Sequence, residues 1–143
     1  MRVASGPRQL SLFKGRRQRG IAPPPPLEFS VQCALADTLK RWCLPGWWYS
    51  HLPFGEYRLP ATARKLQRMG VRPGLPDFIF LHQLGDTAWL ELKRGRSKLS
   101  DDQQTMFGYL AKRGDTVMLA TSYQEAVAAL QDASILPRTI KPQ

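Results

Sequence analysis

The sequence predicts one mixed α/β domain that follows a basic tail. Three observations support this fold class: helical and strand patterns alternate along the chain, two adjacent apolar strands can form a hairpin, and 43% of the 143 residues are hydrophobic. The expected order is helix, strand, helix, strand, strand, helix, strand, helix. We therefore expect a mixed β-sheet of about four strands flanked by helices, within residues 27–143.

Residues 1–26 form the predicted tail. They contain six basic residues and no acidic residue, and they end in four consecutive prolines. We expect this segment to be disordered, because a polar, proline-stiffened stretch buries too little apolar surface to fold alone. A contact with phosphates and a solubilising leader both remain open as its role.

The first half of the domain contains two predicted helices and a strand. Apolar residues recur every four positions after the prolines, as in an amphipathic helix, at Leu27, Val31, Leu35 and Leu39. Pro45 and Gly46 end that segment, and the aromatic run at 47–52 predicts a strand. Pro60 can begin a second helix that continues to about Met69 and is capped by Gly70.

The second half begins with strands at 77–81 and 87–93, joined by a hairpin loop at 82–86. Ser100 and Gln103 have capping-box spacing, which predicts a helix that Gly114 ends. The apolar run at 116–120 predicts a strand in the interior of the sheet. Ser122 and Glu125 predict a second capping box, which begins a helix that continues to about Gln131.

The hairpin permits a geometric inference about three polar residues. If its loop is centred on Leu84, Asp77 lies directly opposite Glu91, with Cβ atoms about 4.5–5.5 Å apart. Glu91 and Lys93 alternate with apolar residues, so they lie on one face of their strand. The three side chains therefore converge at one end of the sheet.

Two carboxylates this close repel each other unless a proton or a cation lies between them. Oxygen ligands favour a hard ion such as Mg²⁺ or Mn²⁺, which could polarise a phosphate and activate water. Lys93 could position that water or stabilise negative charge on the phosphate. A surface ion cluster is the alternative. The net charge of +10 favours a polyanionic partner, usually nucleic acid, and supports the metal site.

In order along the chain, Gly74-Leu75-Pro76-Asp77, then Glu91-Leu92-Lys93, then Leu99-Ser100-x-x-Gln103 resembles the PD-(D/E)XK nuclease superfamily. Within that superfamily the pattern is similar to the VRR-NUC family of phages and bacteria, over about residues 27–130. The Pro53-x-Gly55-x-x-Arg58 loop is also similar, although Phe54 stands where many members carry Asn. The resemblance implies a restriction-endonuclease-like core.

The resemblance also implies an activity: Mg²⁺- or Mn²⁺-dependent hydrolysis of DNA phosphodiesters, with preference for branched DNA such as four-way junctions and action as a homodimer. It makes Asp77 and Glu91 metal ligands, with the Leu92 carbonyl as a further ligand, and Lys93 the catalytic lysine. It places Glu28 near the metal and gives Gln103 a catalytic role. From spacing alone, both could be structural, because acids favour helix N-termini and Gln103 fits a capping box.

Basic residues surround the predicted site in the sequence. Together they could line a groove for phosphates, although each alone could be a solvated cation. They are Arg58, Arg64, Lys65, Arg68, Arg72, Arg94, Arg96 and Lys98. The aromatic residues Trp47, Trp48 and Tyr49 are better explained by core packing than by base stacking, and a lone His51 is more often structural. The segment 42–49 could provide a dimer interface.

The cysteines and the length of the apolar runs bear on the cellular compartment of the protein. Cys33 and Cys43 lack metal-ligand spacing, so we expect free buried thiols, which suit a reducing bacterial cytoplasm. No apolar run suits a signal peptide or a membrane span. The main alternative function is a non-catalytic DNA-binding protein. An RNA-binding module lacks its usual signatures.

Overall fold

The computed structural model describes residues 26–54 and 58–141. Its elements are α1 (Pro26–Trp42), β1 (Trp47–His51), α2 (Pro60–Arg68), β2 (Phe78–His82), β3 (Thr87–Leu92), α3 (Asp101–Lys112), β4 (Thr116–Ala120) and α4 (Tyr123–Asp132). The predicted order of elements is confirmed. Of the predicted tail, residues 1–25 lie outside the described residues, and Pro26 already belongs to α1.

The four strands form one mixed sheet in the order β1-β2-β3-β4. The first three strands are antiparallel neighbours, whereas β4 runs parallel to β3 because α3 returns the chain to the same end before β4 begins. The prediction that the 116–120 strand lies inside the sheet is wrong. In the described part of the chain β4 has one neighbour, and Leu119 on this edge strand is 49% exposed.

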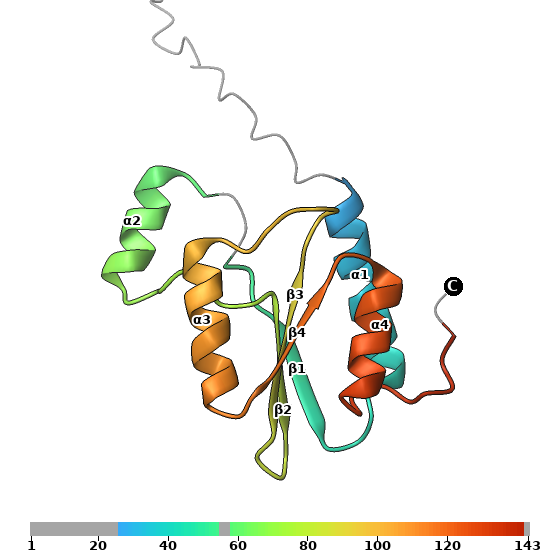
Figure 1. The fold of residues 1–143 in the computed structure, drawn as a ribbon. Helices are drawn as coiled ribbons and strands as arrows, with labels where there is room; N and C mark the ends of the chain where they lie inside the picture. The colour runs from blue at the N-terminus through green and yellow to red at the C-terminus, as the bar shows by residue number, and fades with distance from the viewer. Residues whose placement is uncertain (1–25, 55–57, 142–143) are drawn as a thin grey trace, which may run out of the picture.

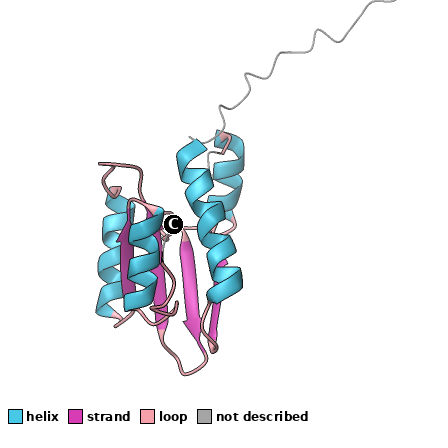
Figure 2. Cartoon of the chain, turned by 90° about the vertical axis from the view of Figure 1, so that its right-hand side faces the viewer, coloured by secondary structure: helices cyan, strands magenta, loops and turns pink. Residues whose placement is uncertain are grey.

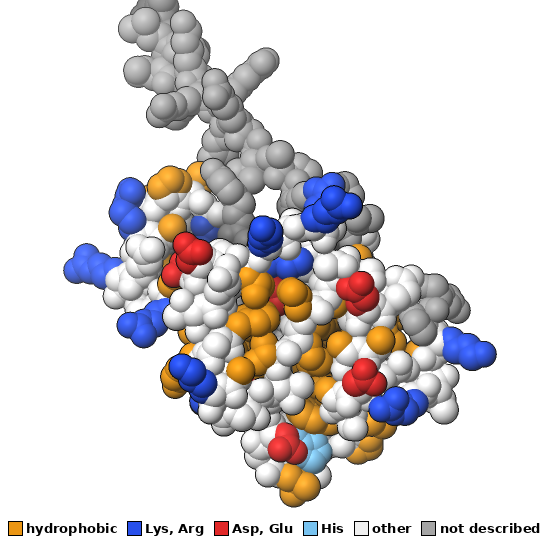
Figure 3. Space-filling model, viewed as in Figure 1, with side chains coloured by type: hydrophobic (Ala, Val, Ile, Leu, Met, Phe, Trp, Pro, Cys, Tyr) orange, Lys and Arg blue, Asp and Glu red, His pale blue; other side chains and the backbone are white. Residues whose placement is uncertain are grey.

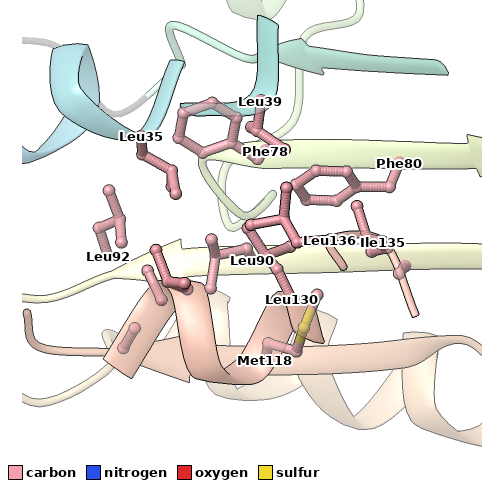
Figure 4. Packing of buried hydrophobic residues seen from close by; sticks show 14 residues of the cluster. Leu35, Leu39, Phe78, Phe80, Leu90, Leu92, Met118, Leu130, Ile135 and Leu136 are labelled. Carbon is pink, nitrogen blue, oxygen red and sulfur yellow. The ribbon is translucent and has the colours of Figure 1, made fainter. Parts of the chain in front are cut away.

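The main core lies between one face of the sheet and the helices α1 and α4. Figures 1 and 2 show these helices beside the sheet, with axes roughly along the strands. Leu35 and Leu39 of α1 and Leu130 of α4 pack with Phe78 and Leu90 of the sheet, and Figure 4 shows these side chains pointing toward one another. The apolar stripe predicted for the first helix is thus confirmed at its buried positions.

The opposite face of the sheet is covered by α3. Alternation along β3 places Leu90 and Leu92 in the main core and Trp89 and Glu91 on the α3 side. The Trp89 indole nitrogen donates to Asp115 Oδ2 at 2.9 Å, just after α3, which ties this strand to the end of the helix. Beyond α3 lies α2, which has no buried residue (Figure 1).

The two predicted capping boxes have different outcomes. At α3 both reciprocal bonds form between Ser100 and Gln103, so this box is confirmed. At α4 Ser122 accepts the Glu125 amide, but the Glu125 carboxylate accepts from the amide and hydroxyl of Thr121 instead of returning to Ser122. The prediction that the Glu125 side chain bonds back to Ser122 is therefore wrong, because that side chain bonds to the preceding residue, Thr121. Those two donors also lower the pKa of Glu125.

The cysteines and the aromatic strand differ in part from expectation. Both thiols are free, but Cys33 is exposed, because it faces away from the buried stripe of α1. Cys43 is half-buried, and burial raises the pKa of its thiol. Trp47 and Tyr49 pack against the core as predicted, whereas Trp48, between them, is 59% exposed. Among the described helices, none is both long and apolar enough for a bilayer.

Candidate active site

The hairpin register brings the two predicted carboxylates to one place. Phe78 pairs with Leu90 and Ile79 with Trp89, which is the register predicted from a loop centred on Leu84. One step further along the same register, Asp77 lies opposite Glu91. The backbone of Asp77 continues the sheet on its other side, because its carbonyl accepts the Leu52 amide at 2.7 Å. The convergence that the sequence predicted at this end of the sheet is confirmed.

Asp77 is held by the strand that faces it. Its Oδ2 accepts the backbone amide of Leu92 at 2.8 Å, which fixes the carboxylate against the end of β3. Lys93, the next residue, is fixed by its own backbone amide, which donates to the Ala120 carbonyl at 2.8 Å. These two bonds, to the last residue of β3 and to the residue after it, hold the Asp77 carboxylate and the base of the Lys93 side chain in a defined arrangement.

Glu91, Lys93 and Gln103 form a closed triangle of contacts. The Lys93 ammonium lies 2.8 Å from Glu91 Oε1 and 2.8 Å from Gln103 Oε1. The Gln103 amide nitrogen donates to the same Glu91 Oε1 at 2.6 Å. Gln103 Oε1 also accepts the Ser100 amide at 3.0 Å, which is the capping-box bond. The sequence left Gln103 open between a capping role and a site role, and the structure gives its side chain both sets of contacts.

The remaining oxygen of Glu91 indicates which group the site could bind. Glu91 is only 3% exposed, and among the described residues its Oε2 is the buried side-chain polar atom without a hydrogen-bond partner. A buried carboxylate oxygen without a partner is costly. With Asp77 opposite and carboxylate oxygens as donors, the pair fits a hard divalent cation such as Mg²⁺ or Mn²⁺.

The fourth predicted ligand, Glu28, is located only through its backbone. It lies in the first turns of α1, which begins at the end of the sheet where β3 ends (Figure 1). Its side chain lies outside the described part of the structure. Within that part, no three His, Cys, Asp or Glu side chains gather as a metal site. Asp77, Glu91 and the backbone of Leu92 are therefore the described portion of the predicted ligand set.

The predicted basic residues lie near this end of the molecule. Figure 3 shows lysine and arginine side chains gathered over α2 and along the edge where β3 leads into α3. Exposed side chains in these two regions are Arg64, Lys65, Arg68, Arg72, Arg94, Arg96 and Lys98. Arg58 differs, because its guanidinium donates to the Pro53 carbonyl and lies 5.9 Å from the centre of the Phe54 ring. His51 lies 5.1 Å from the Phe78 ring, a structural contact.

Gln103 supports a prediction about stability. We expect Gln103→Ala to lower the free energy of unfolding by about 1–2 kcal/mol, because it removes a capping bond and leaves Glu91 with one fewer donor. The matched control is Gln104→Ala, since Gln104 donates only to the Leu99 carbonyl at 3.1 Å and is exposed. Urea unfolding of both variants tests this. Equal losses would show that the Gln103 contacts add no more to folding than the single exposed hydrogen bond of Gln104.

Sequence reasoning missed the part that Gly74 plays beside this site. It lies two residues before Pro76, has φ +97°, and packs against the backbone of Asp102 and Gln103 at the start of α3. The signal available was the Pro73-Gly74 pair, which indicates a turn and favours a positive φ at glycine. No sequence pattern indicates which backbone the turn touches.

The fold is similar to that of two solved structures. No protein-family model matches the sequence, and neither does any curated protein. A solved structure described as a VRR_NUC domain protein superimposes with a TM-score of 0.61 at 25% identity, covering 76% of this chain and 88% of that one. A second, described as a VRR_NUC domain, gives 0.50 at 21% identity, covering 73% and 94%, and shows the fold.

The shared architecture and the motifs agree. The restriction-endonuclease-like mixed sheet that the sequence pattern implied is the one observed, and its Asp77, Glu91-x-Lys93 and Gln103 elements meet at one end of that sheet. In fold and in the order of these motifs, this chain is similar to the VRR_NUC domain protein of the first of these structures.

Proposed function

We propose that this protein is a divalent-metal-dependent endonuclease that hydrolyses DNA phosphodiester bonds. The observation that carries the proposal is Glu91, whose buried Oε2 is without a hydrogen-bond partner while its Oε1 is held by Lys93 and Gln103. Asp77 faces it across the hairpin. The similarity of the fold to a solved structure described as a VRR_NUC domain protein supports the same activity.

The residues have separable tasks in this mechanism. Asp77, Glu91 through Oε2, and the Leu92 carbonyl would hold Mg²⁺ or Mn²⁺, with Glu28 as a further candidate. When bound, the ion supplies Lewis acidity toward a phosphate oxygen and makes water a better nucleophile. Lys93, 17% exposed, directs its ammonium beside the metal ligands, where it stabilises negative charge on the phosphate. Gln103 fixes both Glu91 and Lys93, which keeps the charged groups in place before substrate arrives.

The surface around the site bears on the substrate and on the assembly of the protein. The basic residues on α2 and after β3 would contact phosphates on either side of the cleaved bond. We propose branched DNA, such as a four-way junction, as the substrate, cut by a homodimer with two equivalent sites. Two exposed tryptophans of the segment 42–49 support the homodimer, since Trp42 is 47% and Trp48 is 59% exposed.

A non-catalytic DNA-binding protein is the second candidate, supported by the net charge of +10. The site argues against it. A protein that only binds DNA gains nothing from a pair of carboxylates among its basic residues, because they repel phosphate. The two functions are separated by a panel of labelled duplex, flap, fork and four-way-junction DNA, incubated with Mg²⁺, with Mn²⁺ or with EDTA. Binding without cleavage under every condition would favour the second candidate.

The basic helix α2 supports a prediction about DNA affinity. We expect Arg64→Ala with Arg68→Ala to weaken binding to all DNA structures alike, and to reduce the slope of log affinity against log salt by about 1.8, or about 0.9 per lost phosphate contact on duplex DNA. Both arginines are exposed one helical turn apart.

The matched control removes two charges elsewhere, as Lys112→Ala with Arg138→Ala. Lys112 lies in the last turn of α3, and Arg138 lies beside Asp132 after α4. Binding would be measured by fluorescence anisotropy with Ca²⁺ in place of Mg²⁺. The salt concentration would run from about 50 to about 200 mM, over which log affinity falls linearly with log salt. Equal slopes for the two double variants would show that α2 makes no specific phosphate contacts.

A further inference from the structure

We propose that Gly74 is a positioning residue, which sets the place of the first turn of α3 and through it the contacts of Gln103 with Glu91 and Lys93. The inference rests on the proposed function and extends it to a residue outside the contact triangle. It predicts that a single methyl group at position 74 disturbs the active site through backbone contacts alone, without meeting the side chains of the contact triangle.

The contact is one between two backbones. A Cβ at position 74 would lie 2.5 Å from the Asp102 carbonyl oxygen, 2.7 Å from its carbonyl carbon and 3.2 Å from the Gln103 amide nitrogen. These atoms belong to the first turn of a helix, so they cannot rotate away as the end of a flexible side chain can. Any side chain at 74 must therefore move the turn that carries Gln103, or move its own loop.

Both alternatives disturb the same site. If the start of α3 moves, the Gln103 amide leaves Glu91 Oε1, which it now reaches at 2.6 Å, and its oxygen leaves Lys93. If the loop moves instead, Asp77 moves, because only Leu75 and Pro76 separate it from Gly74. Gly74 thus links the segment that carries Asp77 to the helix α3, whose Gln103 orients Glu91.

The chain offers a matched control for the backbone strain. Gly85, in the hairpin loop, has φ +105°, close to the +97° of Gly74, but a Cβ there would meet no atom within 4 Å. Alanine at either position is strained by the positive φ, but only at position 74 does it also collide. The difference between Gly74→Ala and Gly85→Ala therefore isolates the contact with α3.

The first test follows the Gln103 side-chain amide by NMR, with its signal assigned through its loss in Gln103→Ala. We expect Gly74→Ala to move this resonance and to speed the exchange of its protons, and Gly85→Ala to leave both unchanged. A folded Gly74→Ala protein with an unchanged Gln103 amide would overturn the proposal. This test needs no cleavage, so it decides the positioning even if the proposed nuclease activity fails.

The second test is a double-mutant cycle on cleavage. We expect Gly74→Ala to lower kcat roughly 10- to 10²-fold with little change in KM, since it misplaces groups without removing a substrate contact. If Gly74 acts through Gln103, the double variant Gly74→Ala/Gln103→Ala should be no slower than Gln103→Ala. Losses that multiply would show that Gly74 acts by a route other than Gln103, such as displacement of Asp77, and would overturn the proposal.

The wild-type protein gives a test that survives a folding failure of Gly74→Ala. The close approach predicts strong nuclear Overhauser effects between the Gly74 α-protons and the Gln103 backbone amide. If these effects are not observed, the contact is absent and the inference is wrong.

Discussion

Glu91→Gln is expected to abolish cleavage while leaving the protein folded and able to bind DNA. Glutamine keeps the volume of the side chain and an oxygen that can accept from Gln103 and Lys93. It removes the negative charge of the side chain and puts an amide nitrogen in place of the unpartnered buried oxygen. Metal activation contributes several kcal/mol to such reactions, so the rate should fall by at least about 10³-fold. Asp77→Asn should behave alike.

The measurement has two independent parts. Single-turnover cleavage gives the rate, and calorimetric titration with Mn²⁺ gives metal affinity, which should fall at least about tenfold for a lost carboxylate ligand. Affinity for DNA in EDTA should stay equal or increase, because the variant carries one negative charge fewer. The control is Asp101→Asn, an exposed acid in the first turn of α3. Full activity of Glu91→Gln in Mg²⁺ would remove Glu91 from the mechanism.

Lys93→Arg should lose at least about 10² of the rate, almost as much as Lys93→Ala, with Mn²⁺ affinity largely retained. The ammonium lies 2.8 Å from both Glu91 Oε1 and Gln103 Oε1, a space bounded by two acceptors that fits a compact donor. A guanidinium is wider and planar, so it keeps the charge but displaces at least one of these contacts.

This pair of variants separates charge from position. If Lys93 only balances the charge of the two carboxylates, Lys93→Arg stays active and Lys93→Ala does not. If it holds a phosphate oxygen or the attacking water at close range, both fail. Lys112→Arg, the same change at an exposed site at the end of α3, is the control. Near-wild-type rates for Lys93→Arg would reduce this lysine to a counter-ion.

The hairpin shows which parts of the site sequence alone can predict. The register followed from the loop centred on Leu84 and from alternation along β3, both of which are local properties, and it placed Asp77 opposite Glu91 correctly. Capping-box spacing placed the start of α3 correctly for the same reason. Patterns within a few residues fix these features, because the interactions that make them are short in range.

Features that depend on distant segments were not predictable in this way. The edge position of β4 depends on where α3 returns the chain, which no property of residues 116–120 encodes. Cys33 appeared buried because its helix is amphipathic, yet the exposed side is set by what α1 packs against. The approach of Gly74 to Asp102 joins segments almost thirty residues apart, and its consequence for Gln103 is visible only in three dimensions.

The double use of Gln103 has a consequence for how this protein can change over generations. Active-site groups usually cost stability, so their loss tends to stabilise a fold, and a protein can trade activity for robustness. Glu91, with a buried oxygen left without a partner, fits that rule. Gln103 does not, because the same amide caps α3 and holds the site. At this position selection for folding and selection for the proposed catalysis act in the same direction, so loss of Gln103 brings no gain in stability, whereas loss of Glu91 can.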